Sequence, residues 1–395
     1  MNEMQINNTL KTLVKLIVKN KQNIIDSNQQ DTSACSNIDE SMLDRLRIDE
    51  NKISGMIESI NQTAKLANPK GRTLYTYQHE NGLKIENKTV PFGKILIIYE
   101  SRPDVTIEAT ATAFKAGNKV LLKGGKESRN TNIFLVKLWQ EALFLNGLDK
   151  NHIIYLDINR KKMQDVIRDN SYQIDLIIPR GGEGLINFVT QNTNIPVIIS
   201  GRGNNFLYVD KESDFDMAIK IILNGKQRVS VCNALDKVLI NQDVPDIKSK
   251  ILSLVNSLKT NNIEILGSKN ICELNNQIQE IEDESMFGEE FLSFKILLIL
   301  VNNIDEAMGM TNKYSGGHSA SIITTNNKTA EKFQNEVDCA AVYHNASTRF
   351  TDGGQFGFGA EIAISTQKLH FRGPIGINQL VTNKWFIYGK GQIRN

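Results

Sequence analysis

Residues 93–100 read GKILIIYE, an apolar run with no polar residue from Ile95 to Ile98. Similar runs follow at KVLLKGG (119–125), HIIYLD (152–157), IDLIIPRGG (174–182) and IPVIIS (195–200). Segments with a helical pattern separate them, at 104–116, 128–145, 161–169 and 184–193. Strands without hydrophobic–polar alternation are typical of a parallel sheet that helices cover on both faces. Their alternation with helices predicts an α/β fold.

The predicted strands end in residues that suit ligand binding. Ligands of parallel sheets gather at the carboxyl ends of the strands. Three of these ends read Glu100-Ser101-Arg102, Lys123-Gly124-Gly125 and Arg180-Gly181-Gly182. Two of them are Gly-Gly turns before a predicted helix, where a backbone can approach a phosphate. Neither completes the G-x-G-x-x-G pattern, so tight strand-to-helix turns explain them equally well.

Length and composition narrow the class of protein. A chain of 395 residues predicts two or three lobes. Its 46 basic residues nearly balance 44 acidic ones, and the formal charge of +2 offers no general attraction to nucleic acid or acidic membranes. The amino-terminal residues lack the apolar core of a signal peptide, and no apolar run reaches membrane-spanning length. We therefore expect a cytoplasmic protein with a small-molecule partner, no nucleic acid and no membrane.

The cysteines suggest one candidate for chemistry. Cys35, Cys232, Cys272 and Cys339 are widely separated, without a C-x-x-C pair, so neither a disulfide framework nor a metal site is expected. Cys232 lies in RVSVCNALDK (228–237), on a loop between a helix that ends at Gly225 and the strand KVLI. Backbone amides or nearby cations could activate a thiol there. It could also be one more small buried residue, which is the reading we give the other three.

Six stretches, taken together, resemble the gamma-glutamyl phosphate reductase (glutamate-5-semialdehyde dehydrogenase) family of the aldehyde dehydrogenase superfamily. They are VPFGKILIIYESRPDVTIEA (90–109), KAGNKVLLKGGKES (115–128), DLIIPRGGEGLINFV (175–189), IPVIISGRGNNFLYVD (195–210), SVCNALDKVLI (230–240) and NASTRFTDGGQFGFGAEIAISTQKLHFRGPIG (345–376). The resemblance extends from residue 41 almost to the end of the chain. Long motifs in the same order are more specific than any short signature.

The resemblance implies an aldehyde dehydrogenase-like α/β fold in three parts. Residues 1–225 would form the Rossmann-like NADP-binding lobe with its N-terminal helices, and residues 226–365 the α/β catalytic lobe. Residues 366–395 would return along the chain and end in an oligomerisation strand, with 83–91 as a second candidate strand of that small element. We therefore expect a homodimer or a multiple of it. An uncovered terminal strand would otherwise leave an open sheet edge.

The resemblance also implies the reaction. Cys232 would attack L-glutamyl 5-phosphate, phosphate would leave, and the thioester would take hydride from NADPH to give L-glutamate 5-semialdehyde. This is the second step of proline biosynthesis from glutamate, so functional coupling to a separate glutamate 5-kinase is expected. The Cys232 backbone N–H would hold the oxyanion, with Asn233 shaping the turn and the helix start at Asp104 nearby. Asp104 could instead be a helix N-cap after Pro103.

Further residues follow from the same resemblance. Lys123 and Glu127 would lie along the adenosine ribose, with Lys123 or Lys126 favouring a 2'-phosphate. Gly181-Gly182 would cradle the pyrophosphate, and Glu290 would steady the nicotinamide ribose. Each charged residue could instead be a solvated surface group, above all Lys126.

Substrate contacts are expected from NASTRFTDGG. Arg349 would bind a carboxylate and Asn345 would make polar contacts, although Arg349 could also form a structural ion pair.

Two other functions stay open. A hydrolytic NAD(P)-dependent aldehyde dehydrogenase needs a base that activates water, but Ile199 and Ser200 stand where such enzymes carry a glutamate. A catalytically inactive nucleotide-binding relative would not need Cys232. The chain also departs from many relatives at Asn205-Phe206 and Val229, which leaves substrate affinity in question.

Overall fold

The computed structural model describes residues 1–35 and 40–394. Its internal contacts divide the chain into two compact units. Unit 1 comprises Met1–Ile199, Gly357–Ala363 and Pro374–Asn395, and unit 2 comprises Ser200–Phe356 and Ile364–Gly373. None of the helices in the described residues is both long and apolar enough to cross a membrane.

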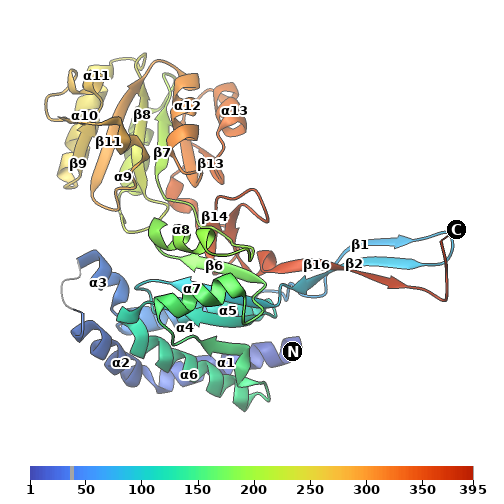
Figure 1. Cartoon of the computed structure of the whole chain (residues 1–395). Coiled ribbons are helices and arrows are strands. Elements are labelled where there is room, and N and C mark those ends of the chain that lie inside the picture. Colours follow the sequence, from blue (N-terminus) through green and yellow to red (C-terminus); the bar gives the residue numbers. More distant parts are fainter. Residues whose placement is uncertain (36–39, 395) are drawn as a thin grey trace. The chain divides into compact units, whose positions relative to one another are not determined.

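Unit 1 contains a four-stranded parallel sheet in the order β5-β4-β3-β6 (Figure 1). Its strands are β3 Lys94–Tyr99, β4 Lys119–Lys123, β5 Ile153–Tyr155 and β6 Leu176–Arg180. Ile95 to Tyr99 are all buried, because both faces of β3 are covered. The predicted α/β repeat is confirmed for these four strands.

The fifth apolar run, IPVIIS, does not form a strand. Its ladder contacts among the described residues are two isolated bridges, a parallel one between Val197 and Ile177 and an antiparallel one between Ser200 and Ser365. Pro196 offers a carbonyl, which accepts from the Ile177 N–H at 2.9 Å, but it has no N–H of its own to continue the ladder. The prediction of a strand at 195–200 was therefore wrong.

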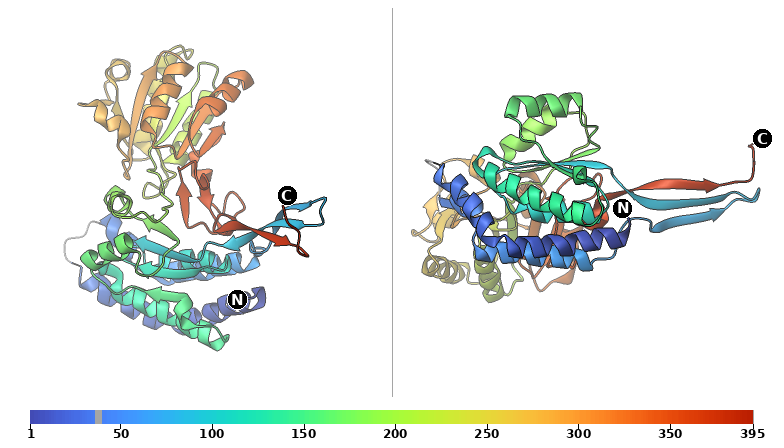
Figure 2. Two further views of the ribbon diagram at one scale, coloured as in Figure 1. Left: turned by 45° about the vertical axis from the view of Figure 1, so that its right-hand side comes forward. Right: turned by 90° about the horizontal axis from the view of Figure 1, so that it is seen from below.

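Helices surround this sheet. The crossover helices are α5 Val105–Lys115, α6 Arg129–Leu145, α7 Arg160–Asp169 and α8 Glu183–Gln191. The N-terminal helices are α1 Glu3–Lys19, α2 Lys21–Ser33, α3 Glu40–Leu46 and α4 Glu50–Lys65. Helix α1 begins with a capping box between Asn2 and Gln5, and it buries Leu10, Leu13 and Ile17 against its neighbours. Both views in Figure 2 show α1 and α6 running side by side.

A three-stranded antiparallel sheet extends from unit 1, in the order β1-β2-β16. Its strands are β1 Thr73–Gln78, β2 Lys84–Pro91 and β16 Val381–Tyr388. The C-terminal strand pairs with β2 along its whole length, from Val381 opposite Pro91 to Tyr388 opposite Lys84. The expectation that the tail is a strand that pairs with another element is confirmed. We call these three strands the β-arm.

Unit 2 is built on a seven-stranded parallel sheet in the order β10-β9-β11-β8-β7-β12-β13. Its strands are β7 Asn205–Val209, β8 Leu235–Asn241, β9 Glu264–Gly267, β10 Gln279–Glu280, β11 Lys295–Val301, β12 Ser319–Ile323 and β13 Ala341–His344. Its helices are α9 Phe215–Gly225, α10 Ile247–Thr260, α11 Lys269–Cys272, α12 Ile304–Tyr314 and α13 Asn327–Glu336. Leu207 and Val209 face α9 and α10, whereas Phe206 and Tyr208 face α12 and α13. Both faces of this sheet are therefore buried.

The remaining elements are short. A two-stranded sheet joins β14 Ala363–Ser365 and β15 Gly373–Ile375. The 3-10 turns are η1 Lys126–Ser128, η2 Lys150–His152, η3 Glu284–Gly288, η4 Thr348–Phe350 and η5 Ile377–Gln379. Residues 200–225 belong to unit 2, because β7 pairs with β8 and β12, whereas the sequence placed the change of lobe after residue 225.

Candidate active site

Cys232 lies in unit 2, on the loop that connects α9 to β8. It is half-buried, as are Cys35 and Cys272, so exposure alone does not single it out. Its surroundings distinguish it, because the backbone of the loop packs tightly against Gly203. A Cβ added to Gly203 would come within 2.1 Å of the Cys232 carbonyl oxygen, so only glycine fits at that position. The backbone at Gly203 thus supports the cysteine directly.

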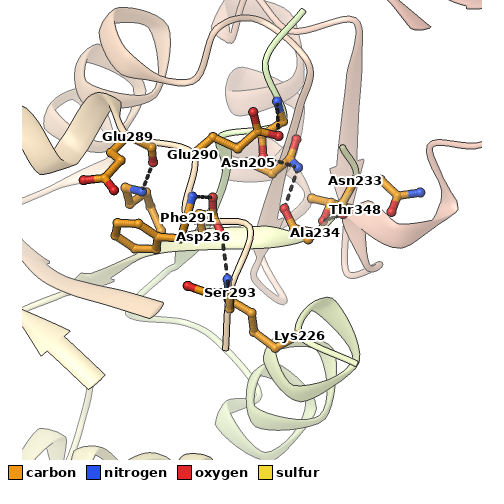
Figure 3. A network of polar contacts seen from close by, with 12 residues as sticks. Asn205, Lys226, Asn233, Ala234, Asp236, Glu289, Glu290, Phe291, Ser293 and Thr348 are labelled. Carbon is orange, nitrogen blue, oxygen red and sulfur yellow. Dashed lines mark hydrogen bonds and ion pairs between the residues drawn. The ribbon is translucent and has the colours of Figure 1, made fainter. Parts of the chain in front are cut away.

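Asn205 makes the polar contacts of this support (Figure 3). Its Nδ2 donates to the carbonyl oxygens of Cys232 at 2.8 Å and Ala234 at 2.6 Å. It also lies 3.0 Å from the carbonyl oxygen of Gly203. Sequence reasoning noted Asn205 only as a departure from relatives and assigned it no role.

Asn233 joins the cysteine loop to the turn η4. Its Nδ2 donates to the carbonyl oxygens of Arg349 at 3.1 Å and Thr351 at 3.0 Å. Its own backbone carbonyl accepts from Thr348 Oγ1 at 2.9 Å, and its Oδ1 accepts from the Arg349 guanidinium. The predicted turn-shaping role of Asn233 therefore has a geometric basis in these four bonds.

Arg349 is consequently held beside the cysteine loop. Burial lowers the pKa of its guanidinium, and the nearby Arg228 lowers it further, whereas Asp352 and Cys232 raise it. Cys232 is thus close enough to affect the pKa of Arg349, whose guanidinium also bonds Asn233. A cation near a thiolate favours the charged, nucleophilic form.

Asn345 is engaged with the backbone. The Asn345 backbone adopts a left-handed conformation with φ of 52°, directly after the end of β13. Its Oδ1 accepts from the Thr324 N–H at 3.0 Å, and its Nδ2 donates to the Thr324 carbonyl at 2.9 Å. Both amide atoms therefore fix the junction between β12 and β13, and the substrate contact expected of Asn345 stays a prediction.

Glu290 reaches the same glycine that supports Cys232. Its Oε1 accepts from the Gly203 N–H at 3.0 Å. Gly203 thus contacts both the predicted nucleophile and the predicted nicotinamide-ribose ligand, within one unit.

Three buried charges that sequence reasoning missed hold the segment around Glu290 (Figure 3). Asp236 accepts from Lys226 Nζ at 2.6 Å and from the Phe291 N–H at 2.8 Å. Lys237 Nζ donates to the Glu289 carbonyl at 2.7 Å and lies 3.6 Å from the centre of the Phe291 ring. Burial lowers the pKa of Lys237 to about 7. Two of the three left a signal in the sequence, since the charges at 236–237 stand directly before the apolar run from Val238 to Ile240.

The predicted ribose ligands lie in unit 1, Lys123 as the last residue of β4 and Glu127 on the turn η1 that follows it. Glu127 Oε1 accepts from the N–H of Ser101 at 2.8 Å and from its hydroxyl at 2.9 Å. Lys123 Nζ donates to the Gly124 carbonyl at 2.8 Å, and burial lowers its pKa against the opposing effects of Asp157 and Glu127. Lys126 is exposed on η1, as its alternative interpretation predicted.

Gly181 and Gly182 form the turn before α8, as expected. Gly182 occupies the N-cap position of α8, and no atom lies within 4 Å of a Cβ added there. Glu100 Oε2 accepts from the Gly182 N–H at 3.0 Å. The turn therefore binds an anion, but the anion is a side chain of the protein. Sequence reasoning did not identify this role of Glu100.

Asp104 occupies the N-cap position of α5 without acting as a side-chain cap. Its φ of −54° and ψ of −33° are already helical, and its side chain makes no capping bond. The interpretation of Asp104 as a side-chain N-cap was therefore wrong. Its Oδ1 is buried without a hydrogen-bond partner among the described residues. One turn later, burial raises the pKa of Glu108 to about 7, and the Asp104 carboxylate adds to that rise.

Comparison with known proteins agrees with this arrangement. The model of the aldehyde dehydrogenase family matches residues 7–271 and 281–361. A gamma-glutamyl phosphate reductase of Clostridium botulinum (strain Alaska E43 / Type E3) is 44% identical over 392 residues, covering 98% of this chain and 94% of that protein. A gamma-glutamyl phosphate reductase of Nitratiruptor sp. is 44% identical over 385 residues, covering 96% of this chain and 92% of that protein.

A solved structure is similar along the whole chain. The crystal structure of a gamma-glutamyl phosphate reductase from Thermotoga maritima has a TM-score of 0.95 at 38% identity, covering 100% of this chain and 95% of that one. This similarity confirms the predicted aldehyde dehydrogenase-like α/β fold. The chain therefore belongs to the aldehyde dehydrogenase family and, within it, to the gamma-glutamyl phosphate reductases.

Proposed function

We propose that this protein catalyses the NADPH-dependent reduction of L-glutamyl 5-phosphate to L-glutamate 5-semialdehyde, with release of phosphate. The reaction is the second step of proline biosynthesis from glutamate. One observation carries the proposal: Cys232 lies on a loop whose backbone is fixed by Gly203 and Asn205, next to the charge of Arg349. A half-buried thiol outside any disulfide, in such a setting, suits a nucleophile better than a packing residue.

The chain's own residues account for the first half-reaction. The Cys232 thiolate attacks the acyl carbon, forming a C–S bond while the carbonyl electron pair moves to the oxygen. When that pair returns, the C–O bond to phosphate breaks and a thioester remains. The Cys232 backbone N–H stabilises the oxyanion, because a donor fixed in place costs no reorganisation during the reaction. When bound, the nicotinamide cofactor supplies the hydride that reduces the thioester and frees Cys232.

Residues in unit 1 fit such a cofactor. The open space beside Gly182 at the start of α8 suits a phosphate group, which would have to displace Glu100 from the Gly182 N–H. Lys123 offers a half-buried cation, and Glu127 a carboxylate that can accept from ribose hydroxyls. Preference for NADPH over NADH would come from Lys123 or Lys126. In unit 2, Glu290 would steady the nicotinamide ribose.

Substrate recognition is proposed to rest on Arg349. Its guanidinium can bind a carboxylate in a bidentate manner. Asn345 is the weaker candidate, because both its amide atoms already bond Thr324. We further propose that the enzyme works in the cytoplasm, assembles as a homodimer or a multiple of it, and receives its labile substrate from a separate glutamate 5-kinase.

The test is NADPH oxidation coupled to a purified glutamate 5-kinase with ATP and glutamate. Oxidation should require the kinase and ATP, and NADH should replace NADPH poorly. Absence of kinase-dependent oxidation would overturn the proposal. The coupled assay is needed because the acyl phosphate is too labile to be supplied as a reagent.

The reverse reaction separates this proposal from a hydrolytic dehydrogenase. Ile199 cannot accept a proton and neutral Ser200 is a poor base, so water should attack the thioester slowly. Oxidation of glutamate 5-semialdehyde by NADP should therefore require inorganic phosphate. The measurement is NADPH and glutamate formation by desalted enzyme, with and without added phosphate. Rapid glutamate formation without phosphate would support the hydrolytic function instead.

A further inference from the structure

Asn205 is a fully buried polar residue placed beneath the cysteine loop. It is the first residue of β7, and its exposed fraction is 0%. Its amide nitrogen lies within hydrogen-bond distance of three backbone carbonyl oxygens, at 2.8 Å for Cys232, 2.6 Å for Ala234 and 3.0 Å for Gly203. Figure 3 shows the contact with Ala234. An amide group carries two protons, so three acceptors compete for them. The Asn205 amide is therefore fully committed to the backbone around Cys232.

The orientation of this amide is fixed by what surrounds it. Rotating the group by half a turn would place its oxygen against three carbonyl oxygens, which is repulsive. In the observed orientation Asn205 Oδ1 is buried without a hydrogen-bond partner among the described residues. An unpaired buried acceptor is unfavourable. The observed orientation nevertheless directs both N–H groups of the Asn205 amide at backbone carbonyl oxygens.

The two shortest contacts join carbonyls that are two residues apart. The loop has no helix or strand of its own between Gly225 and Leu235 to set its backbone. By bridging the carbonyls of Cys232 and Ala234, Asn205 fixes the peptide planes that follow these two residues. The direction of the Cys232 Cα–Cβ bond follows from those planes. Asn205, which belongs to β7, thus fixes the position of the Cys232 thiol relative to that strand.

Gly203 also connects the cysteine loop to the segment around Glu290. Gly203 packs against the backbone of Cys232 and donates its N–H to Glu290 Oε1 at 3.0 Å. Gly203 and Asn205, at the start of β7, therefore contact both the Cys232 loop and Glu290.

We infer that Asn205 is a positioning residue for the thiol of Cys232, acting through the carbonyls of Cys232 and Ala234. This inference rests on the proposed function, in which Cys232 is the nucleophile. Asn205 touches neither substrate nor cofactor in this role. Its loss should alter the chemical step and the reactivity of one cysteine, and should not primarily weaken binding.

The neighbouring Asn204 offers a matched control. It is also 0% exposed, and its Oδ1 is also buried without a partner among the described residues. Its Nδ2 donates to two carbonyl oxygens, those of Phe287 and Tyr314, both at 2.8 Å. The two asparagines thus differ mainly in which backbone they hold. Asn204→Ala should cost as much stability as Asn205→Ala but leave the Cys232 loop in place.

The experiment compares Asn205→Ala with Asn204→Ala in the full-length protein. We expect similar decreases in Tm, but a fall in kcat of about tenfold or more for Asn205→Ala only, since small misplacements of reacting groups can cost up to about a hundredfold. The KM for each substrate should change less than about threefold. The rate of Cys232 alkylation by iodoacetamide, followed by peptide mass spectrometry, should change at least severalfold in Asn205→Ala and stay near wild type in Asn204→Ala. Equal kcat and equal alkylation rates in the two variants would overturn the inference.

A second pair guards against loss of folding. Asn205→Ser keeps one hydroxyl donor and is compared with Asn204→Ser. The two serine variants should again lose similar amounts of Tm, whereas kcat should fall only in Asn205→Ser, by less than in Asn205→Ala. Cys232→Ala, assayed in parallel, distinguishes failure of the thioester mechanism from failure of the positioning role of Asn205. If Cys232→Ala retains turnover, the thioester mechanism itself fails. If Cys232→Ala is inactive while both Asn205 variants turn over like their Asn204 partners, only the positioning role fails.

Discussion

The carboxylate of Glu100 accepts a hydrogen bond from the backbone N–H of Gly182, with 3.0 Å between Oε2 and N. Gly182 is exposed and caps the N-terminus of α8, where backbone N–H groups attract anions. The sequence predicted that this turn holds the pyrophosphate of a dinucleotide. A protein carboxylate therefore takes the place of a phosphate at this amide, and it would compete with one.

Glu100→Gln should tighten cofactor binding. The substitution keeps the shape of the side chain but removes a negative charge from the helix N-terminus, an effect on the order of 0.3–1 kcal/mol, or about two- to fivefold in Kd. The Kd for NADPH is measured by fluorescence titration at low ionic strength. Glu141→Gln, an exposed charge on α6, is the control and should leave Kd unchanged. Weaker binding by Glu100→Gln would show that Glu100 assists the cofactor instead of competing with it.

Cys232→Ala should abolish turnover, because a methyl group cannot form a thioester. Cys35→Ala, Cys272→Ala and Cys339→Ala should each retain activity. Cys339 is buried and lies 3.4 Å from Ser315 Oγ, so its loss should lower Tm modestly without changing kcat. The coupled NADPH assay and thermal melts check the series. Wild-type turnover by Cys232→Ala would contradict the mechanism.

Deleting residues 384–395 should weaken assembly. The deletion removes most of β16 and leaves the edge of β2 unpaired, so a β-arm that joins subunits would lose its outer strand. Light scattering with size-exclusion chromatography reports the oligomer mass. Deleting only residues 389–395, which lie beyond the end of β16 at Tyr388, is the matched control and should preserve the oligomer. An unchanged mass after the longer deletion would exclude the β-arm as an assembly element.

Lys237 should make stability depend on pH above neutrality. Burial lowers its pKa in the folded protein to about 7, well below the value of about 10.4 expected in an unfolded chain. Between these values the unfolded state binds more protons, so the free energy of unfolding increases with pH. The cost of burying this ammonium is fully present below pH 7 and is relieved as pH rises, on the order of a few kcal/mol at about 1.36 kcal/mol per pKa unit.

Lys237→Met removes this dependence. The free energy of unfolding of the variant relative to wild type should therefore fall from pH 7 to pH 10, as followed by urea denaturation. Lys295→Met on β11, whose side chain is 29% exposed, is the control and should give a curve parallel to wild type. Parallel curves for Lys237→Met as well would mean that Lys237 keeps its proton in the folded protein.

Local pattern was sufficient for much of the fold. The unbroken apolar run from Ile95 to Tyr99 predicts a strand buried on both faces, and β3 is one. The placement of Cys232 on a loop follows from Gly225, at which α9 ends and whose helix propensity is low. Such features depend on residues near one another in the chain, so burial and backbone preference can be read from short stretches. The family's motifs carried the chemistry in the same way.

Contacts between distant segments were beyond the reach of the sequence. IPVIIS has the composition of a strand, yet it makes only one bridge to β6, because a ladder needs a partner edge and Pro196 lacks an N–H. Glu100 and Gly182 form a hydrogen bond although they are 82 residues apart in the chain, and Asn205 and Cys232 do so at a separation of 27 residues. A side chain's hydrogen-bond partner depends on which backbone groups the packed sheets leave near it, and composition carries no record of that. Hence the nucleophile could be chosen from the sequence, whereas the groups that hold it in place became visible only once the strands were assembled.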